Sequence, residues 1–143
     1  MDVVAFEIRT ATRTDAGDLL ALWSNAGSVP TVTDSREALA SLLDHDPEAV
    51  LVGVEGGRVV GSLIAAWDGW RGNFYRLAVY PDRRRRGLAT ALVREGERRL
   101  RARGAVRLTA IVADDEDEAL AFWSAAGYEQ QRQRERFVRV FPG

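Results

Sequence analysis

The sequence predicts a single α/β domain over residues 1–143, built on a mixed, mostly antiparallel sheet with helices on both of its faces. The length of 143 residues, with 46% hydrophobic and 29% charged side chains, is typical of one globular domain. Segments with helical periodicity are interspersed with β-branched runs along the whole chain. A Gly-Gly pair between two such runs indicates a tight hairpin in the middle of the sheet. The expected order of elements is βααβββαβαββ.

The first third of the chain predicts one strand and two helices. Residues 6–11 alternate weakly and are followed by Thr14, Asp15 and periodic apolar positions at 19–23, which predict a strand and then a capped helix. Residues 25–33 are rich in Gly, Pro, Ser and Thr and predict a loop. Asp34 and Glu37 have the spacing of a capping box, so a second helix should begin there and run to about Leu43.

The central third predicts three consecutive antiparallel strands and a long helix. Residues 49–55 and 58–67 flank the hairpin turn Gly56-Gly57, and residues 68–72 form a second turn before the strand 73–80. That strand should end at Pro81, because proline cannot donate to the next ladder bond. Apolar positions from residue 88 to residue 100 follow helical spacing, and Gly104 is a suitable stop.

The last third predicts a strand over 106–112, a helix over 116–126 that ends at Gly127, and a more polar strand pair over 128–140. There is no internal repeat or low-complexity linker.

Composition excludes several kinds of chemistry. The chain has no cysteine and one histidine, so it cannot form disulfides, thiolate metal sites, a cysteine nucleophile or a multi-histidine metal site, and we expect no metal. The net charge of −1 gives no overall attraction to nucleic acid or an anionic membrane. No apolar run approaches the roughly 20 residues that span a bilayer, and the first residues lack a signal-peptide core, so we expect a cytoplasmic protein.

The most informative segment is residues 77–90, which joins a strand to a helix. Four arginines, Arg83 to Arg86, precede the positive end of that helix, where an anion would compensate them. Free amides at a helix start, with Gly87 allowing close approach, can hold a pyrophosphate. The same arginines could instead form a solvated basic turn or contact RNA, and the residues alone leave these alternatives open.

The segment resembles the GCN5-related N-acetyltransferase (GNAT) family, whose pyrophosphate signature is Arg/Gln-x-x-Gly-x-Gly/Ala. Here the signature reads Arg84-Arg85-Arg86-Gly87-Leu88-Ala89, and it follows Leu77-Ala78-Val79-Tyr80-Pro81, which is similar to the family's aliphatic strand ending in Val-x-Pro. A later family feature is matched by Ala119, Phe122-Trp123 and Gly127-Tyr128. The predicted order of elements is also that of the acyl-CoA N-acyltransferase fold.

The resemblance implies that acetyl-CoA is the cosubstrate and that an acetyl group passes directly to an amine. The implied cofactor contacts are backbone pairing of the pantetheine with Leu77, Ala78 and Val79, and a pyrophosphate held at Arg84, Arg85, Arg86, Gly87, Leu88, Ala89 and Thr90. We expect a small-molecule amine as acceptor, with protein lysines or N-termini as an alternative, and a monomer or homodimer. A non-catalytic acyl-CoA-binding or sensor domain is a further alternative.

The catalytic groups depart from the family's pattern. Asn73 stands where some members have a glutamate base, Trp123 where others have a tyrosine acid, and Glu116 where an asparagine often touches the cofactor. The remaining candidates for proton transfer are Tyr75, Asp68, Tyr128 and Glu55, for each of which a packed ring or a solvated carboxylate is the simpler interpretation. Trp67, Trp70 and His45 are expected in hairpin packing and at a helix end.

Overall fold

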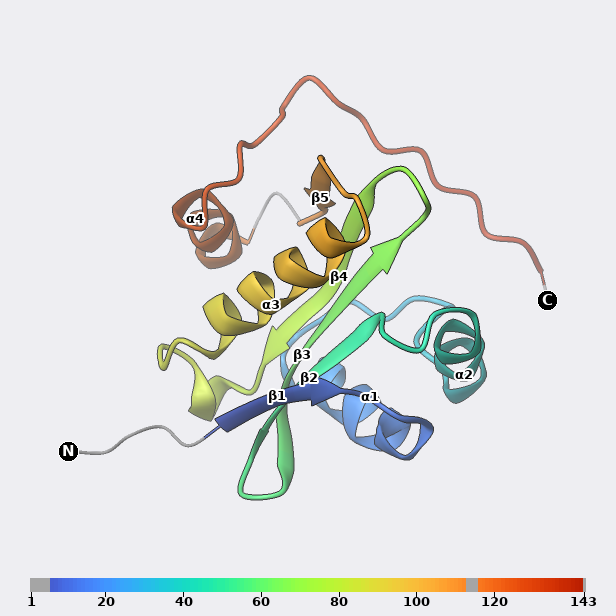
Figure 1. Cartoon of the computed structure of the whole chain (residues 1–143), viewed down its shortest axis with the longest axis vertical. Coiled ribbons are helices and arrows are strands. Elements are labelled where there is room, and N and C mark those ends of the chain that lie inside the picture. Colours follow the sequence, from blue (N-terminus) through green and yellow to red (C-terminus); the bar gives the residue numbers. More distant parts are fainter. Residues whose placement is uncertain (1–5, 113–115, 143) are drawn as a thin grey trace. The chain divides into compact units, whose positions relative to one another are not determined.

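The structure is a computed structural model that describes residues 6–112 and 116–142. It divides into two compact units, Met1–Ala110 and Ile111–Gly143. The first unit contains the strands β1 (Phe6–Thr10), β2 (Val50–Glu55), β3 (Arg58–Trp67), β4 (Gly72–Val79) and β5 (Leu108–Ala110), and the helices α1 (Ala16–Asn25), α2 (Arg36–His45) and α3 (Leu88–Ala102) (Figure 1). The second unit contains α4 (Asp117–Ala125).

The five strands form one mixed sheet in the order β1-β2-β3-β4-β5. The first four pair antiparallel, and β5 pairs parallel to β4. The predicted hairpin is confirmed: Gly56 and Gly57 have φ values of 58° and 78°, which is the left-handed pair that a two-residue turn between twisted strands requires. The mixed, mostly antiparallel fold class is therefore confirmed.

Helices cover both faces of the sheet, as predicted. One face of β2, at Val50, Val52 and Val54, joins a core cluster with residues of α1 and α2. Helix α3 packs on the other face (Figure 1), where it comes so close that a Cβ on Gly53 would lie 2.6 Å from Leu88 Cδ1. The same holds within α3, where a Cβ on Gly96 would lie 2.8 Å from Phe74 Cε1. Small residues thus let this helix lie directly on the strands.

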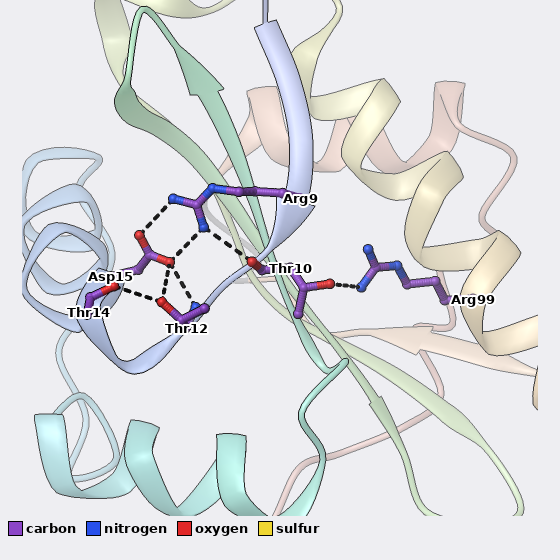
Figure 2. Close-up of polar contacts among 6 residues, drawn as sticks. All are labelled: Arg9, Thr10, Thr12, Thr14, Asp15 and Arg99. Atoms are coloured by element: carbon purple, nitrogen blue, oxygen red, sulfur yellow. Dashed lines mark hydrogen bonds and ion pairs between the residues drawn. The ribbon is translucent and has the colours of Figure 1, made fainter.

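The start of the first helix is fixed by a polar cluster around Asp15 (Figure 2). Asp15, a predicted cap residue, is the N-cap of α1 and follows a short 3-10 helix, Arg13–Asp15. Its carboxylate accepts two hydrogen bonds from Arg9, at 2.8 and 2.9 Å, and one from the Thr12 amide at 2.8 Å. These contacts, led by the hydrogen bond from Arg9, lower the pKa of Asp15. On the far side of β1, Thr10 Oγ1 accepts a 2.9 Å bond from Arg99 of α3.

The second helix differs from the prediction at both ends. Ser35 is its N-cap, with a side chain that accepts from the Ala38 amide at 3.1 Å, so the predicted box of Asp34 and Glu37 is wrong. Asp34 is instead engaged by an arginine of β4, described below. The helix also continues past Leu43 to end at His45, whose position at a helix end was predicted.

The strand predicted over 106–112 is shorter in the structure, where only Leu108–Ala110 pair with β4. Val106 lies before this strand and is 96% exposed. In the second unit, α4 confirms the predicted helix over 116–126 and Gly127 follows it with φ 99°. The predicted strand pair over 128–140 is wrong: residues 128–142 have no strand. Every side chain from residue 129 to residue 136 is polar or charged, so an isolated hairpin there would have no apolar face to bury.

Candidate active site

The site begins at the edge of β4, where the sheet opens. Within the described residues, β5 pairs with Gly72, Asn73 and Phe74 and with no later residue of β4. The Tyr80 amide donates to Val60 O at 3.0 Å on the β3 side, so strand alternation directs the backbone groups of Val79 and Leu77 to the opposite edge. The second half of β4 therefore presents main-chain donors and acceptors that β5 leaves unpaired.

A bulge in β4 shapes this edge. The β3–β4 register shifts between Ser62 and Ile64, which face Ala78 and Tyr75, so β4 carries one extra residue. Arg76 lies in that bulge with φ 53°, a left-handed conformation that costs a non-glycine residue roughly 1–2 kcal/mol.

A buried polar chain holds the bulge in place. Ser62 Oγ donates to Arg76 O at 2.8 Å and accepts from Trp23 Nε1 at 2.8 Å. Ser62 is fully buried, and this chain satisfies its hydroxyl. Sequence reasoning missed these three residues; the only signal was a serine inside an otherwise apolar strand.

The turn that follows β4 presents a run of backbone amides. A short 3-10 helix, Pro81–Arg83, leads to Arg85 with φ 63° and to Gly87, which is the N-cap of α3 with φ 83°. No described residue accepts a hydrogen bond from the amides of residues 85–90. A Cβ on Gly87 would have no described atom within 4 Å, so the space beside this residue is open. These amides are free donors at the positive end of a 15-residue helix, where an anion can bind.

Three of the four arginines are engaged by the protein itself. Arg83 forms ion pairs with Glu55 at 2.8 Å and Asp82 at 3.0 Å, and Arg86 lies 3.5 Å from Glu55. Arg84 Nε donates to Val79 O at 3.1 Å. Arg85 has no hydrogen bond or ion pair with a described residue. The positive charge before the helix is therefore partly compensated by carboxylates, one of which, Glu55, is distant in the sequence.

The candidate proton-transfer groups of the first unit lie in different settings. Tyr75 is 45% exposed on β4 and pairs with Ile64, whereas the two carboxylates are already engaged. Asp68 Oδ1 accepts from the amides of Trp70 and Arg71 at 2.8 and 2.7 Å, and these bonds, led by that of Arg71, lower its pKa. Glu55 holds the arginines described above. A carboxylate with a lowered pKa is a weaker base, and Glu55 is already engaged by arginines. Tyr75 is therefore the best of these three candidates for proton transfer.

The remaining candidates lie in the second unit. Trp123 is buried and makes T-shaped contacts with Phe122 and Tyr128, with ring centroids 5.5 and 5.0 Å apart. The three rings pack against one another, which agrees with the simpler interpretation of Tyr128 as a packed ring. Glu116 is the N-cap of α4.

Among the described residues, no group of three or more histidine, aspartate or glutamate side chains could hold a metal ion. None of the helices in that part of the chain combines the length and the apolar character needed to cross a bilayer.

The fold is that of known acetyltransferases. The crystal structure of Ard1 from Thermoplasma volcanium superimposes with a TM-score of 0.78 at 22% identity, covering 87% of this chain and 82% of that one. The PaiA N-acetyltransferase from Thermoplasma acidophilum, solved in complex with coenzyme A, gives a TM-score of 0.75 at 14% identity and covers 89% and 91% of the two chains. At these identities, the likeness shows the fold alone.

Sequence relatives show the family. The family model described as "Acetyltransferase (GNAT) family" matches residues 18–128. An acetyltransferase of Yersinia enterocolitica is 36% identical over 125 residues, which cover 87% of this chain and 89% of the relative. An acetyltransferase of Sodalis glossinidius is 35% identical over the same length, covering 87% and 88%. The chain belongs to the GNAT acetyltransferase family, as its signature at residues 84–89 predicted.

Proposed function

We propose that this acetyltransferase takes its acetyl group from acetyl-CoA and transfers it to a small-molecule amine. The observation that carries the proposal is the continuity of two sets of backbone groups that pair with no strand, although Val79 O accepts a hydrogen bond from Arg84. The open edge of β4 leads directly into the amides of residues 85–90, which have no acceptor among the described residues. An elongated ligand with amides at one end and phosphates at the other matches that sequence of donors and acceptors.

The residues present fit coenzyme A. Leu77 and the Val79 amide offer strand-like backbone groups to the two amides of the pantetheine arm, while Val79 O is held by Arg84 and Ala78 fixes the strand against β3. The amides of residues 85–90, with Gly87 leaving open space, would bind the diphosphate, and the exposed Arg85 would add a charge-assisted bond. PaiA and the aminoglycoside N-acetyltransferase AAC(6')-Iy, which has a TM-score of 0.73, were both solved with coenzyme A.

The reaction needs little covalent help from the protein. The amine nitrogen attacks the thioester carbonyl, the carbon–sulfur bond breaks, the amine loses a proton and the thiolate gains one. The Val79 amide, on the open edge, is placed to stabilise the negative charge that develops on the carbonyl oxygen. Tyr75 is our candidate for handling the proton, directly or through water, and holding both reactants in place supplies much of the remaining rate acceleration.

Two measurements on the purified protein test the proposal. Calorimetry should detect coenzyme A binding, and thiol release from acetyl-CoA should increase with at least one of 2-phenylethylamine, spermidine or a lysine-containing peptide. The chain contains no lysine, so acetylation of its own side chains adds no background. Absence of coenzyme A binding would refute the proposal. Binding without turnover of any amine would favour the sensor alternative, and turnover of the peptide alone would favour a protein acetyltransferase.

A further inference from the structure

The loop between α1 and α2 is attached to the candidate cofactor segment by two arginines. We call residues 26–35 the interhelix loop. Arg76, in the bulge of β4, donates from Nε and Nη2 to the carboxylate of Asp34 at 3.1 and 2.5 Å, and from Nη2 to Val29 O at 3.2 Å. Arg84, whose Nε binds Val79 O, donates from Nη2 to Ala26 O at 3.3 Å. Both ends of the loop are thus held by residues of the segment 76–84.

The ion pair of Arg76 and Asp34 is shielded from solvent. Their side chains are only 20% and 14% exposed, and the guanidinium lies 5.6 Å from the centroid of the Trp23 ring. Salt screens a shielded pair much less than an exposed one, and the two parallel hydrogen bonds fix its geometry. This contact therefore restrains the interhelix loop more firmly than a surface ion pair would.

Arg76 acts on the strand and on the loop through different groups. Its carbonyl is fixed by Ser62, and its left-handed backbone shapes the open edge beside Leu77 and Val79. Its guanidinium holds the loop. Arg76 therefore offers a direct connection between the backbone at the bulge and the interhelix loop.

We propose that Arg76 is a positioning residue that couples occupancy of the β4 edge to the position of the interhelix loop through Asp34. The proposal rests on the proposed function, because it takes coenzyme A as the ligand of that edge. Tyr75, next to Arg76, is an exposed residue. It pairs with Ile64 and so lies on the same face of the sheet, where Ile64 belongs to the core cluster that includes α1 and α2. A fixed loop beside this exposed face would form part of the wall against which the amine binds.

The test uses variants that remove the ion pair and keep the bulge. Asp34→Asn removes the charge of the carboxylate. Arg76→Gly removes the guanidinium, and the glycine adopts the positive φ of this position without strain. Asp46→Asn is the matched control, because Asp46 forms a similarly shielded 2.8 Å ion pair with Arg103 at the far end of α3. The exchanged pair Asp34→Arg with Arg76→Asp should restore the contact, since aspartate tolerates the left-handed region better than most residues.

Hydrogen exchange of peptides covering residues 26–35 is measured with and without coenzyme A. In the original protein, coenzyme A should slow exchange at least about fivefold, a typical lower limit for coupled sites. In Asp34→Asn and Arg76→Gly this response should disappear, and in Asp34→Asn, which leaves the β4 edge untouched, calorimetry should give unchanged coenzyme A affinity. For the amine with the fastest thiol release, KM should rise about fivefold or more while KM for acetyl-CoA stays constant. Asp46→Asn should retain the response, and the exchanged pair should recover part of it.

The outcomes separate this inference from the proposed function. If coenzyme A binds but the loop does not respond, or if both variants respond like the original protein, the coupling is refuted and the function stands. If coenzyme A does not bind at all, the proposed function fails. In that case, hydrogen exchange without ligand tests whether the Arg76–Asp34 ion pair holds the interhelix loop. Faster exchange of the loop in Asp34→Asn than in Asp46→Asn supports this role, and equal exchange overturns it.

Discussion

Replacing Gly87 by alanine separates the backbone cost of the proposed diphosphate cradle, the amides of residues 85–90, from its ligand-binding role. Gly87 has φ 83°, so a side chain there incurs roughly 1–2 kcal/mol of left-handed strain. Loss of glycine's freedom in the unfolded chain returns about 0.4–1 kcal/mol. No described atom lies within 4 Å of the added Cβ, so no clash adds to this. We expect a net loss of about 1 kcal/mol, equivalent to a fall in Tm of roughly 2–4 °C for a chain of this size.

The effect on coenzyme A binding should be larger than the effect on stability. The methyl group would occupy open space beside Gly87, within the run of amides 85–90 that we propose for the diphosphate. A hydrogen bond to a charged group contributes about 1.5–3 kcal/mol, so losing even one raises Kd about 10-fold or more. A bulkier residue, as in Gly87→Val, should abolish measurable binding while the protein stays folded.

Calorimetry and thermal denaturation measure the two effects, and Gly69→Ala provides the control. Gly69, in the turn between β3 and β4, has φ 89° and also has no described atom within 4 Å of its added Cβ. Both alanine variants should therefore lose similar stability, but only Gly87→Ala should lose coenzyme A affinity. An unchanged Kd for Gly87→Ala, or an equal rise in Kd for both variants, would refute the cradle.

Three further predictions concern the scaffold. Gly96→Val should lower the free energy of unfolding by about 1–3 kcal/mol, because its Cβ would lie 2.8 Å from the ring of Phe74; an unchanged urea midpoint would contradict this packing. Arg98 lowers the pKa of Glu95 to about 2, so the stabilisation is full above pH 4.5 and is lost as the pH falls towards 2. Tm of Glu95→Gln should therefore lie below that of the original protein at pH 7, and the two should converge near pH 2; a constant difference would argue against the ion pair. Asp15→Ala should cost about 1–3 kcal/mol in urea denaturation, because it leaves the donors of Figure 2 without their acceptor, and a smaller loss than for an exposed aspartate would disprove this role.

Local signals predicted most of the fold because each acts over a few residues. The two glycines of the β2–β3 turn, the helical spacing in α3 and the stop at Gly104 each have a direct backbone cause, and each was confirmed. The cap of α2 was misassigned because Asp34 and Ser35 are both good caps, and the Asp34 carboxylate is taken by the Thr31 amide and by Arg76, which is 42 residues away. The strand pair over 128–140 was wrong because residues 129–136 offer no apolar face that a partner strand or helix could cover.

The sequence located the candidate site but not its internal arrangement. The strand, the turn and Gly87 were found because a signature records local backbone needs. The bulge at Arg76 was not found, because arginine is not a residue that marks a left-handed position. The hydrogen bonds that hold this bulge come from Ser62 on β3 and Trp23 on α1, both of which are far from Arg76 in the sequence. Long-range side-chain contacts of this kind have no local sequence signal.

The arginine run shows how three-dimensional partners change the meaning of a charge cluster. An RNA contact would need several guanidiniums free to meet phosphates along a backbone. Here Glu55 and Asp82 hold Arg83, Glu55 also lies beside Arg86, and Arg84 is turned onto main-chain carbonyls. The groups left for a ligand are backbone amides and Arg85, which suit a compact diphosphate better than an extended polyanion. Coenzyme A affinity should accordingly fall only weakly as the salt concentration rises, because few ionic contacts hold the ligand. A steep fall in affinity with ionic strength, together with RNA competing for the same site, would show that the arginines themselves are the binding surface.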